Sequence, residues 1–137
     1  MRRVVLVAAT FAAGLGLVTA AEPLRQRILE NYAAEARKDS PSFSGLSAER
    51  GKALYFGPHP GGQPEACSTC HTANPTKPGQ HSKTGREIAP MAISVNPDRF
   101  TDPAEVEKRF VRDCKNVLRR PCTAQEKGDF ITFLSQQ

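Results

Sequence analysis

The apolar residues recur at helical spacing in four stretches of the chain, and no stretch alternates between apolar and polar residues in the manner of a strand. The spacing predicts helices over residues 23–38, 47–56, 102–118 and 123–137. Residues 58–100 contain most of the prolines and glycines, and an irregular segment of this length in a small domain is expected to wrap something or to be disordered. The first helix is predicted to bury Leu24, Ile28, Leu29 and Tyr32.

Capping residues mark where three of these helices begin. Ser47, Asp102 and Thr123 each occupy an expected N-cap position, and a glutamate follows three residues after Asp102 and after Thr123, as in a capping box. Within the second helix, Gly51 has no side chain and is predicted to let the last helix approach closely through Phe130 or Phe133. The pattern as a whole predicts an all-α domain.

The first 20 residues are organised like a secretory signal peptide. Two arginines follow the first methionine, an apolar run covers residues 4–18, and Val-Thr-Ala precedes a cleavage site before Ala21. An uncleaved anchor is the alternative, but this run is short for a span of about 20 residues. We expect residues 1–20 to be removed and residues 21–137 to form one periplasmic domain. Loss of the two arginines lowers the formal net charge from +5 to +3, and an exported protein is expected to meet no nucleic acid.

The strongest chemical signal is the pentapeptide Cys67-Ser68-Thr69-Cys70-His71. C-x-x-C-H is the attachment motif of c-type haem, in which two thiols add to the vinyl groups and the histidine becomes the proximal iron ligand. A zinc site from Cys67, Cys70, Cys114 and Cys122 is the alternative, but the second pair is widely spaced and His71 would have no role. A thioredoxin-like pair would need a βαβ pattern. We therefore expect one covalent haem c, which would complete the core of a small domain.

An aspartate lies on the apolar side of the third predicted helix. At about 100° per residue, Asp113 falls roughly 20° from Val106, within the stripe that Val106 forms with Phe110, Cys114 and Val117. A buried carboxylate is costly unless it is paired. Its partner is expected to be either Arg109, four residues earlier, or the haem iron. Asp113 follows His71 by 42 residues, a separation that suits a distal ligand.

Other distal ligands stay open at this point. Asn116 lies at the edge of the apolar stripe and is a second candidate oxygen donor. His59 and His81 are in loops, where a histidine is usually solvated, and an open or water-bound iron is a further alternative. Methionine ligation is disfavoured. The one methionine left after signal removal, Met91, directly follows Pro90, and if Pro90 lies on the proximal side of the haem, Met91 lies there too.

Several segments together resemble the sphaeroides haem protein family, an oxygen-binding group of class I cytochromes c. The resemblance rests on GKALYF, CSTCH, TGREIAP, PDRFTD and VEKRFVRDCKNVLRRPCTAQEKGDF, which cover most of residues 21–137 in the family's order. It implies a small class I cytochrome c-like helical fold wrapped around one covalently attached haem, with an extra N-terminal helix.

The resemblance also implies roles for residues around the haem. Pro90 takes the place of the proline whose carbonyl accepts a hydrogen bond from the proximal histidine, although a simple turn residue is the alternative, and Met91 is expected to pack against the haem edge. The residue before the first of two disulfide-bonded cysteines is, in that family, an asparagine that binds oxidised iron and is released on reduction. Asp113 stands there, and the implied disulfide joins Cys114 to Cys122. A carboxylate is expected to favour ferric iron and to lower the reduction potential.

These features lead to one functional expectation. The chain is expected to be a periplasmic monohaem cytochrome that accepts electrons and, when reduced, binds oxygen or nitric oxide. The resemblance implies a dihaem cytochrome c donor and a membrane cytochrome b as partners. A plain electron carrier, with Met91 or a histidine as sixth ligand, and a gas-storing or sensing module are the alternatives. An electron-transfer or gas-binding role is expected rather than that of a dedicated enzyme.

Overall fold

The computed structural model describes residues 20–137, so the expected signal peptide lies outside the described residues apart from Ala20. Within this part the chain forms five helices and one short hairpin, in the order α1 (Ala21–Asp39), α2 (Ala48–Phe56), α3 (Ser68–His71), β1 (Gly79–Gln80), β2 (Glu87–Ile88), α4 (Pro103–Val117) and α5 (Ala124–Leu134). None of the helices in residues 20–137 combines the length and apolar character needed to cross a membrane.

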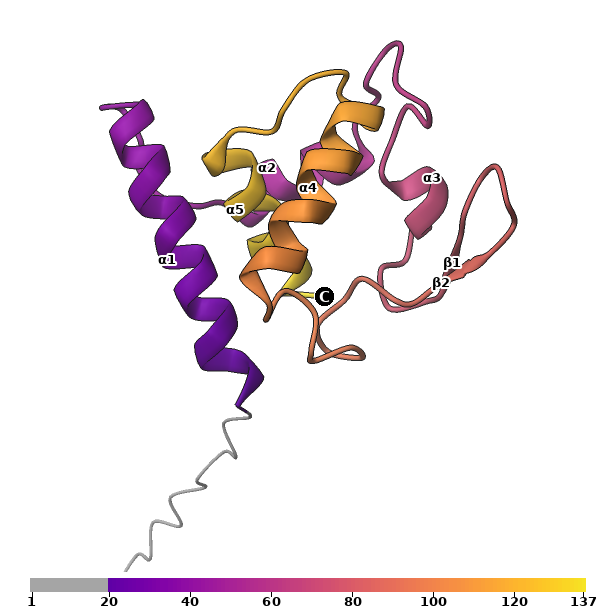
Figure 1. Ribbon diagram of the computed structural model, residues 1–137, viewed down its shortest axis with the longest axis horizontal. Coiled ribbons are helices and arrows are strands. Elements are labelled where there is room, and N and C mark those ends of the chain that lie inside the picture. Colours follow the sequence, from indigo (N-terminus) through magenta and orange to yellow (C-terminus); the bar gives the residue numbers. More distant parts are fainter. Residues whose placement is uncertain (1–19) are drawn as a thin grey trace, which may run out of the picture.

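The helices surround a core rich in aromatic side chains. α5 packs against both α2 and α1, while α3 and the β1–β2 hairpin lie on the side of the molecule away from α1 (Figure 1). The ring of Phe130 lies edge-on to those of Phe110 and Phe100, and it also neighbours Tyr55. Tyr55 and Ile131 are fully buried. The core therefore joins α2, α4 and α5, and the segment that follows α2 is wrapped beside it.

All four predicted helices are confirmed, and the three predicted N-cap residues accept hydrogen bonds from the first turns. Ser47 Oγ accepts from Arg50 N–H, Asp102 accepts from Ala104 N–H and Glu105 N–H, and Thr123 closes a full capping box with Glu126. The capping box predicted at Asp102 is only half formed, because the Glu105 carboxylate binds Lys108 and Arg109 instead. The all-α class is confirmed, with two additions inside residues 58–100. Helix α3 is a single turn and each strand has two residues. Elements this short cannot show a periodicity, which is why the pattern did not reveal them.

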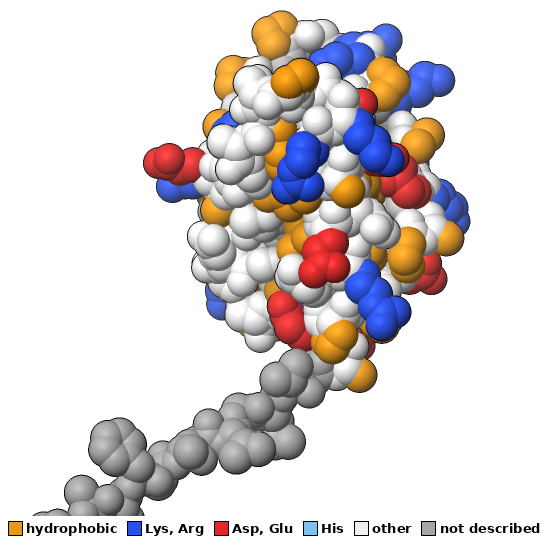
Figure 2. All heavy atoms as spheres, turned by 90° about the vertical axis from the view of Figure 1, so that its left-hand side faces the viewer, with side chains coloured by type: hydrophobic (Ala, Val, Ile, Leu, Met, Phe, Trp, Pro, Cys, Tyr) orange, Lys and Arg blue, Asp and Glu red, His pale blue; other side chains and the backbone are white. Residues whose placement is uncertain are grey.

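The buried face of α1 differs from the prediction at one position. Leu24 is 45% exposed, whereas Arg25, Ile28, Tyr32 and Ala36 are buried, with Arg25 only 2% exposed. The predicted inclusion of Leu24 was therefore wrong. Arg25 can be buried because its guanidinium donates hydrogen bonds to the carbonyls of Pro97 and Arg99 and pairs with Glu22. Outward-facing side chains of α1 carry charges of both signs, and acidic and basic groups are interspersed on this face (Figure 2).

Gly51 brings α2 and α5 into backbone contact, as predicted. A Cβ atom at position 51 would lie 2.0 Å from the carbonyl oxygen of Asp129 and 2.9 Å from Cβ of Phe133. Both are rigidly placed atoms of α5, so a side chain at Gly51 would force the two helices apart.

Gly51→Ala is therefore expected to destabilise the protein, by about 1–3 kcal/mol, although alanine favours a helix over glycine by up to about 1 kcal/mol. Denaturant unfolding followed by circular dichroism measures the change, with Lys52→Ala on the exposed side of α2 as control. A Gly51→Ala protein as stable as the control would show that this close approach has no energetic role.

Candidate functional site

The two cysteines of the C-x-x-C-H motif lie one turn apart on α3. Cys67 has helical backbone angles and caps the helix, and Cys70 and His71 follow within it. Residues three apart in a helix share a face, so the two thiols lie on one side. Both are free, with Cys70 buried and Cys67 partly buried. Burial, with a smaller effect from the charge of Asp113, raises the pKa of the Cys67 thiol to about 12.

The backbone of α3 is held by two neighbours from other parts of the fold. The hydroxyl of the fully buried Tyr55 lies 2.7 Å from the carbonyl oxygen of His71 and 2.8 Å from that of Thr72. Gly79 packs so closely that a Cβ on it would lie 2.0 Å from the carbonyl oxygen of Cys70. These contacts fix the motif through main-chain atoms and leave the side chains of Cys67, Cys70 and His71 free for chemistry.

His71 is suited to bind a metal ion as a neutral imidazole. Burial, helped by the positive charge of Arg99, lowers the pKa of His71 to about 4, so the ring is uncharged at neutral pH. Its Nδ1 is the one buried side-chain nitrogen or oxygen among residues 20–137 without a hydrogen-bond partner. An unsatisfied polar atom of this kind in a native core calls for an explanation, and the binding of a cofactor beside this imidazole is one. Two free thiols beside this imidazole are the donor set that a covalently attached haem requires.

The predicted hydrogen bond from His71 to Pro90 is not formed. The carbonyl oxygen of Pro90 accepts instead from Arg99 Nε at 2.7 Å and from Asn96 Nδ2 at 3.1 Å. A charged guanidinium is a stronger donor than a neutral imidazole, so Arg99 occupies the acceptor. Met91 is buried, as expected of a residue that fills core space, and its N–H donates to the carbonyl of Pro75.

Two arginines connect α1 to this loop. Arg25 donates to the carbonyl of Arg99, and the Arg99 guanidinium in turn binds the carbonyls of Ala89 and Pro90. The sequence analysis missed both residues. Arg25 shares the helical spacing of Ile28, which was a usable signal, whereas Arg99 lies in an irregular segment and gave none. Helix α1 thus fixes the loop that places positive charge near His71.

Asp113 does not form the Arg109 pair that was one of its two predicted alternatives, and it is not buried as its place in the apolar stripe predicted. Arg109 binds Glu105 instead, with 2.6 Å between Nε and Oε1. The carboxylate of Asp113 is instead held by both arms of Arg112, at 2.6 Å and 3.0 Å, and its side chain is 46% exposed. Its charge still acts on the pKa values of both Cys67 and His71, which places the carboxylate within electrostatic reach of α3.

The other candidate ligands are less well placed. Asn116 is exposed on α4. The His59 ring lies 2.9 Å from the carbonyl oxygen of Leu54, and His81, exposed in the hairpin loop, is engaged by Thr84. Among these candidates, Asp113 is the one whose negative charge acts on the pKa values of Cys67 and His71.

Cys114 and Cys122 form the disulfide that the resemblance implies, with 5.6 Å between their Cα atoms. It joins the last turn of α4 to the residue before the N-cap of α5 and thereby holds the helix that carries Asp113. A four-cysteine zinc site is excluded, and within residues 20–137 no three histidine, cysteine or acidic side chains gather in a way that could hold a metal ion.

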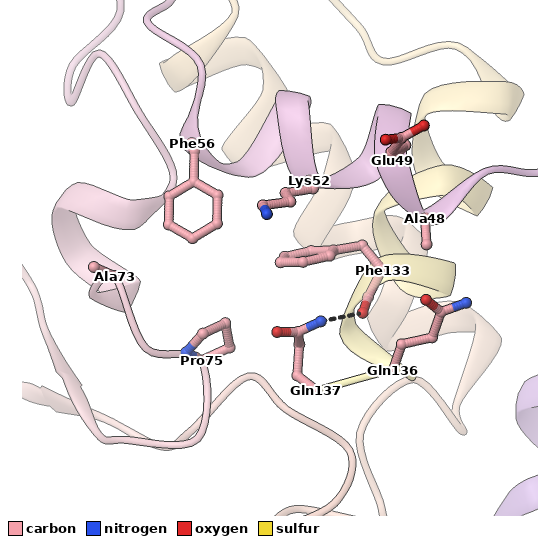
Figure 3. A pocket seen from close by; sticks show the side chains of 9 residues that line it. All are labelled: Ala48, Glu49, Lys52, Phe56, Ala73, Pro75, Phe133, Gln136 and Gln137. Atoms are coloured by element: carbon pink, nitrogen blue, oxygen red, sulfur yellow. Dashed lines mark hydrogen bonds between the residues drawn. The ribbon is translucent and has the colours of Figure 1, made fainter.

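A cavity of about 350 Å³ lies between α2 and the C-terminal end of the chain. Phe56, Ala73, Pro75 and Phe133 are among the residues around it (Figure 3). None of Cys67, Cys70, His71 or Asp113 lines this cavity, so it is separate from the motif.

The helical fold and the C-x-x-C-H site together define a c-type cytochrome of the class I-like type. Residues 41–134 match the family described as a domain of unknown function, DUF1924. The whole chain is 40% identical to the full length of the cytochrome c-type protein SHP of Cereibacter sphaeroides. The chain belongs to this family, that of the sphaeroides haem protein, and its cofactor is covalently bound haem c.

A second relative and two solved structures agree with this assignment. Cytochrome c″ of Methylophilus methylotrophus is 36% identical over 112 residues, which are 80% of this chain and 77% of that protein. Oxidised SHP, described as an oxygen-binding cytochrome c, has a TM-score of 0.74 at 43% identity and covers 82% of this chain and 96% of its own. Oxidised cytochrome c″ has a TM-score of 0.75 at 33% identity and covers 84% of this chain and 95% of its own. The predicted fold class is thereby confirmed.

Arg99→Gln is expected to lower the reduction potential. The change removes a positive charge that opposes the ferric state. It also removes the guanidinium that donates to the Pro90 carbonyl, so that the His71 ring can donate to this carbonyl and become a more basic iron ligand. Loss of a charge interaction of about 1 kcal/mol corresponds to a fall in reduction potential of some tens of millivolts. Spectroelectrochemical titration measures it, with Arg86→Gln on the exposed hairpin as control. An unchanged or raised potential in Arg99→Gln alone would contradict this role.

Replacing both Cys114 and Cys122 by serine is expected to lower the free energy of unfolding by about 2–3 kcal/mol, because the bridge restricts the unfolded chain. The denatured wild-type protein should contain no titratable thiol, since its other two cysteines are expected to carry the haem. Two thiols per chain in that titration would show that the bridge is absent from the protein in solution.

Proposed function

We propose that Cys67 and Cys70 attach the haem, that His71 is its proximal ligand and that Asp113 binds ferric iron on the distal side. The observation that carries this proposal is the buried imidazole of His71, whose Nδ1 has no hydrogen-bond partner, beside the two free thiols of Cys67 and Cys70. Asp113 directly precedes the disulfide-bonded Cys114, at the place where the family resemblance implies a distal ligand. The helix α4 and its disulfide to Cys122 hold it there. Two solved relatives support a labile sixth position: oxidised SHP is an oxygen-binding cytochrome c, and haem-ligand detachment is described for cytochrome c″.

A haem held by Cys67, Cys70 and His71 would supply a redox-active iron that can bind a small molecule. The carboxylate of Asp113 is a hard anionic ligand, so it stabilises ferric iron more than ferrous iron. After reduction, Arg112 offers this carboxylate a bidentate partner. The pair is about half exposed and therefore stabilises the released state by no more than about 1 kcal/mol. The released position is then available to oxygen or nitric oxide.

This arrangement suits a periplasmic monohaem cytochrome that accepts electrons and binds a diatomic gas when reduced. The disulfide supports an oxidising compartment. The family resemblance supports a dihaem cytochrome c as donor and a membrane cytochrome b as a further partner.

A plain electron carrier with Met91 as sixth ligand has less support. The Met91 N–H donates to the carbonyl of Pro75, at 2.9 Å, and Pro75 is four residues beyond the proximal histidine candidate. This backbone contact supports a place for Met91 on the proximal side of the proposed site rather than at the sixth position.

Asp113→Ala is expected to change the ferric visible spectrum and to leave the ferrous spectrum and its shift with carbon monoxide nearly unchanged. Asp113→Asn is expected to raise the reduction potential, because a neutral amide stabilises ferric iron less than an anion does. Arg109→Ala, on the same helix but paired with Glu105, is the matched control. If the carboxylate only pairs with Arg112, the ferric spectrum of Asp113→Ala will equal that of the wild type, and Asp113 is then not an iron ligand.

A further inference from the structure

The net charge of the chain is concentrated in one short stretch. Residues 108–120 contain six basic side chains and one acidic side chain, a formal net charge of +5, against +3 for residues 21–137 once the signal arginines are removed. The rest of that expected mature domain therefore carries a formal net charge of −2. All six basic residues are exposed; we call them the α4 basic surface, and they are Lys108, Arg109, Arg112, Lys115, Arg119 and Arg120.

These cations are available to a partner. Arg109 and Lys108 share Glu105, Arg112 binds Asp113 and Arg120 binds Glu126, all as partly exposed pairs. Exposed ion pairs are each worth about 0–1 kcal/mol, so the carboxylates of another protein can replace them at small cost. Lys115 and Arg119 make no ion pair within residues 20–137.

The same surface has an apolar centre and lies beside the proposed site. Val111, on the outward side of α4, is 65% exposed, more than any other large hydrophobic residue among those described. Protein interfaces combine apolar contacts with a charged rim, and Val111 among these cations has that composition. Asp113, on the same helix, acts electrostatically on Cys67 and His71. A protein seated here would therefore lie near the iron.

We propose that the α4 basic surface docks an acidic face of a protein electron donor. This inference rests on the proposed acceptance of electrons: the donor gives up one electron, which reduces ferric iron to ferrous iron. Complementary charge would steer the donor to the helix and raise the association rate. An anionic membrane is disfavoured, because a membrane-bound helix exposes a wide apolar face. The apolar face of α4, which includes Val106, Phe110 and Val117, is buried in the protein instead.

Stopped-flow reduction of the ferric holoprotein by fully reduced flavodoxin, a small acidic one-electron donor, tests the proposal. The test variant is Lys115→Glu/Arg119→Glu. The control, Lys83→Glu/Arg86→Glu, reverses two exposed cations near the hairpin turn and changes the net charge equally. At low ionic strength the second-order rate constant is expected to fall about ten-fold or more in the test variant and less than about two-fold in the control. Salt should slow the wild type and remove the difference.

An equal fall in both variants would mean that only net charge matters, and equal rates in all three proteins would also overturn the docking surface. Sedimentation with phosphatidylglycerol vesicles tests the other source of negative charge. Vesicle binding lost in the test variant, with flavodoxin rates unchanged, would assign the surface to a membrane instead. The shift of the dithionite-reduced spectrum with carbon monoxide reports an intact site in each variant. A wild-type protein that dithionite cannot reduce would overturn the proposed function itself, whatever the variants do.

Discussion

The structure depends on how the single turn of α3 is held. Tyr55 binds the carbonyls of His71 and Thr72, and the backbone of Gly79 lies against the carbonyl of Cys70. Every one of these contacts uses main-chain atoms of α3. The motif is therefore fixed in place while its two thiols and its imidazole stay free for the cofactor. Tyr55 can do this because it is fully buried against α5, which approaches α2 closely at Gly51.

The electrostatic surroundings of His71 come from elements far apart in the sequence. Arg99 brings positive charge from the loop before α4, and Asp113 brings negative charge from within α4. Burial lowers the local dielectric response, so each charge acts more strongly on the imidazole than it would in water. The two charges have opposite effects on the pKa of His71, and in the proposed haem complex they would have opposite effects on the ferric state.

Helix α1 has a structural role that links it to this site. Its buried Arg25 holds the carbonyls of Pro97 and Arg99, and Arg99 in turn holds the carbonyls of Ala89 and Pro90. Tyr32, also on α1, donates to Glu107 of α4, which is bound by Lys127 of α5. Helix α1, which also adds Tyr32 to the aromatic core, thereby restrains both the loop that contains Pro90 and Arg99 and the helix that carries Asp113.

Much of this protein could be predicted from its sequence. Helical spacing and capping residues located four helices, C-x-x-C-H indicated the haem, and the missing side chain of Gly51 indicated a close helix contact. These predictions were possible because each feature depends on residues that are near in the chain or on a chemically specific motif. Only the tertiary structure decided which partners the polar groups took. Asp113 bound Arg112 rather than Arg109, Arg99 occupied the Pro90 carbonyl expected to serve His71, and Arg25 was buried where Leu24 was expected. A donor or a charged group can bind any partner that the fold brings within about 3 Å, and the spacing of residues along the chain does not show which partners those are.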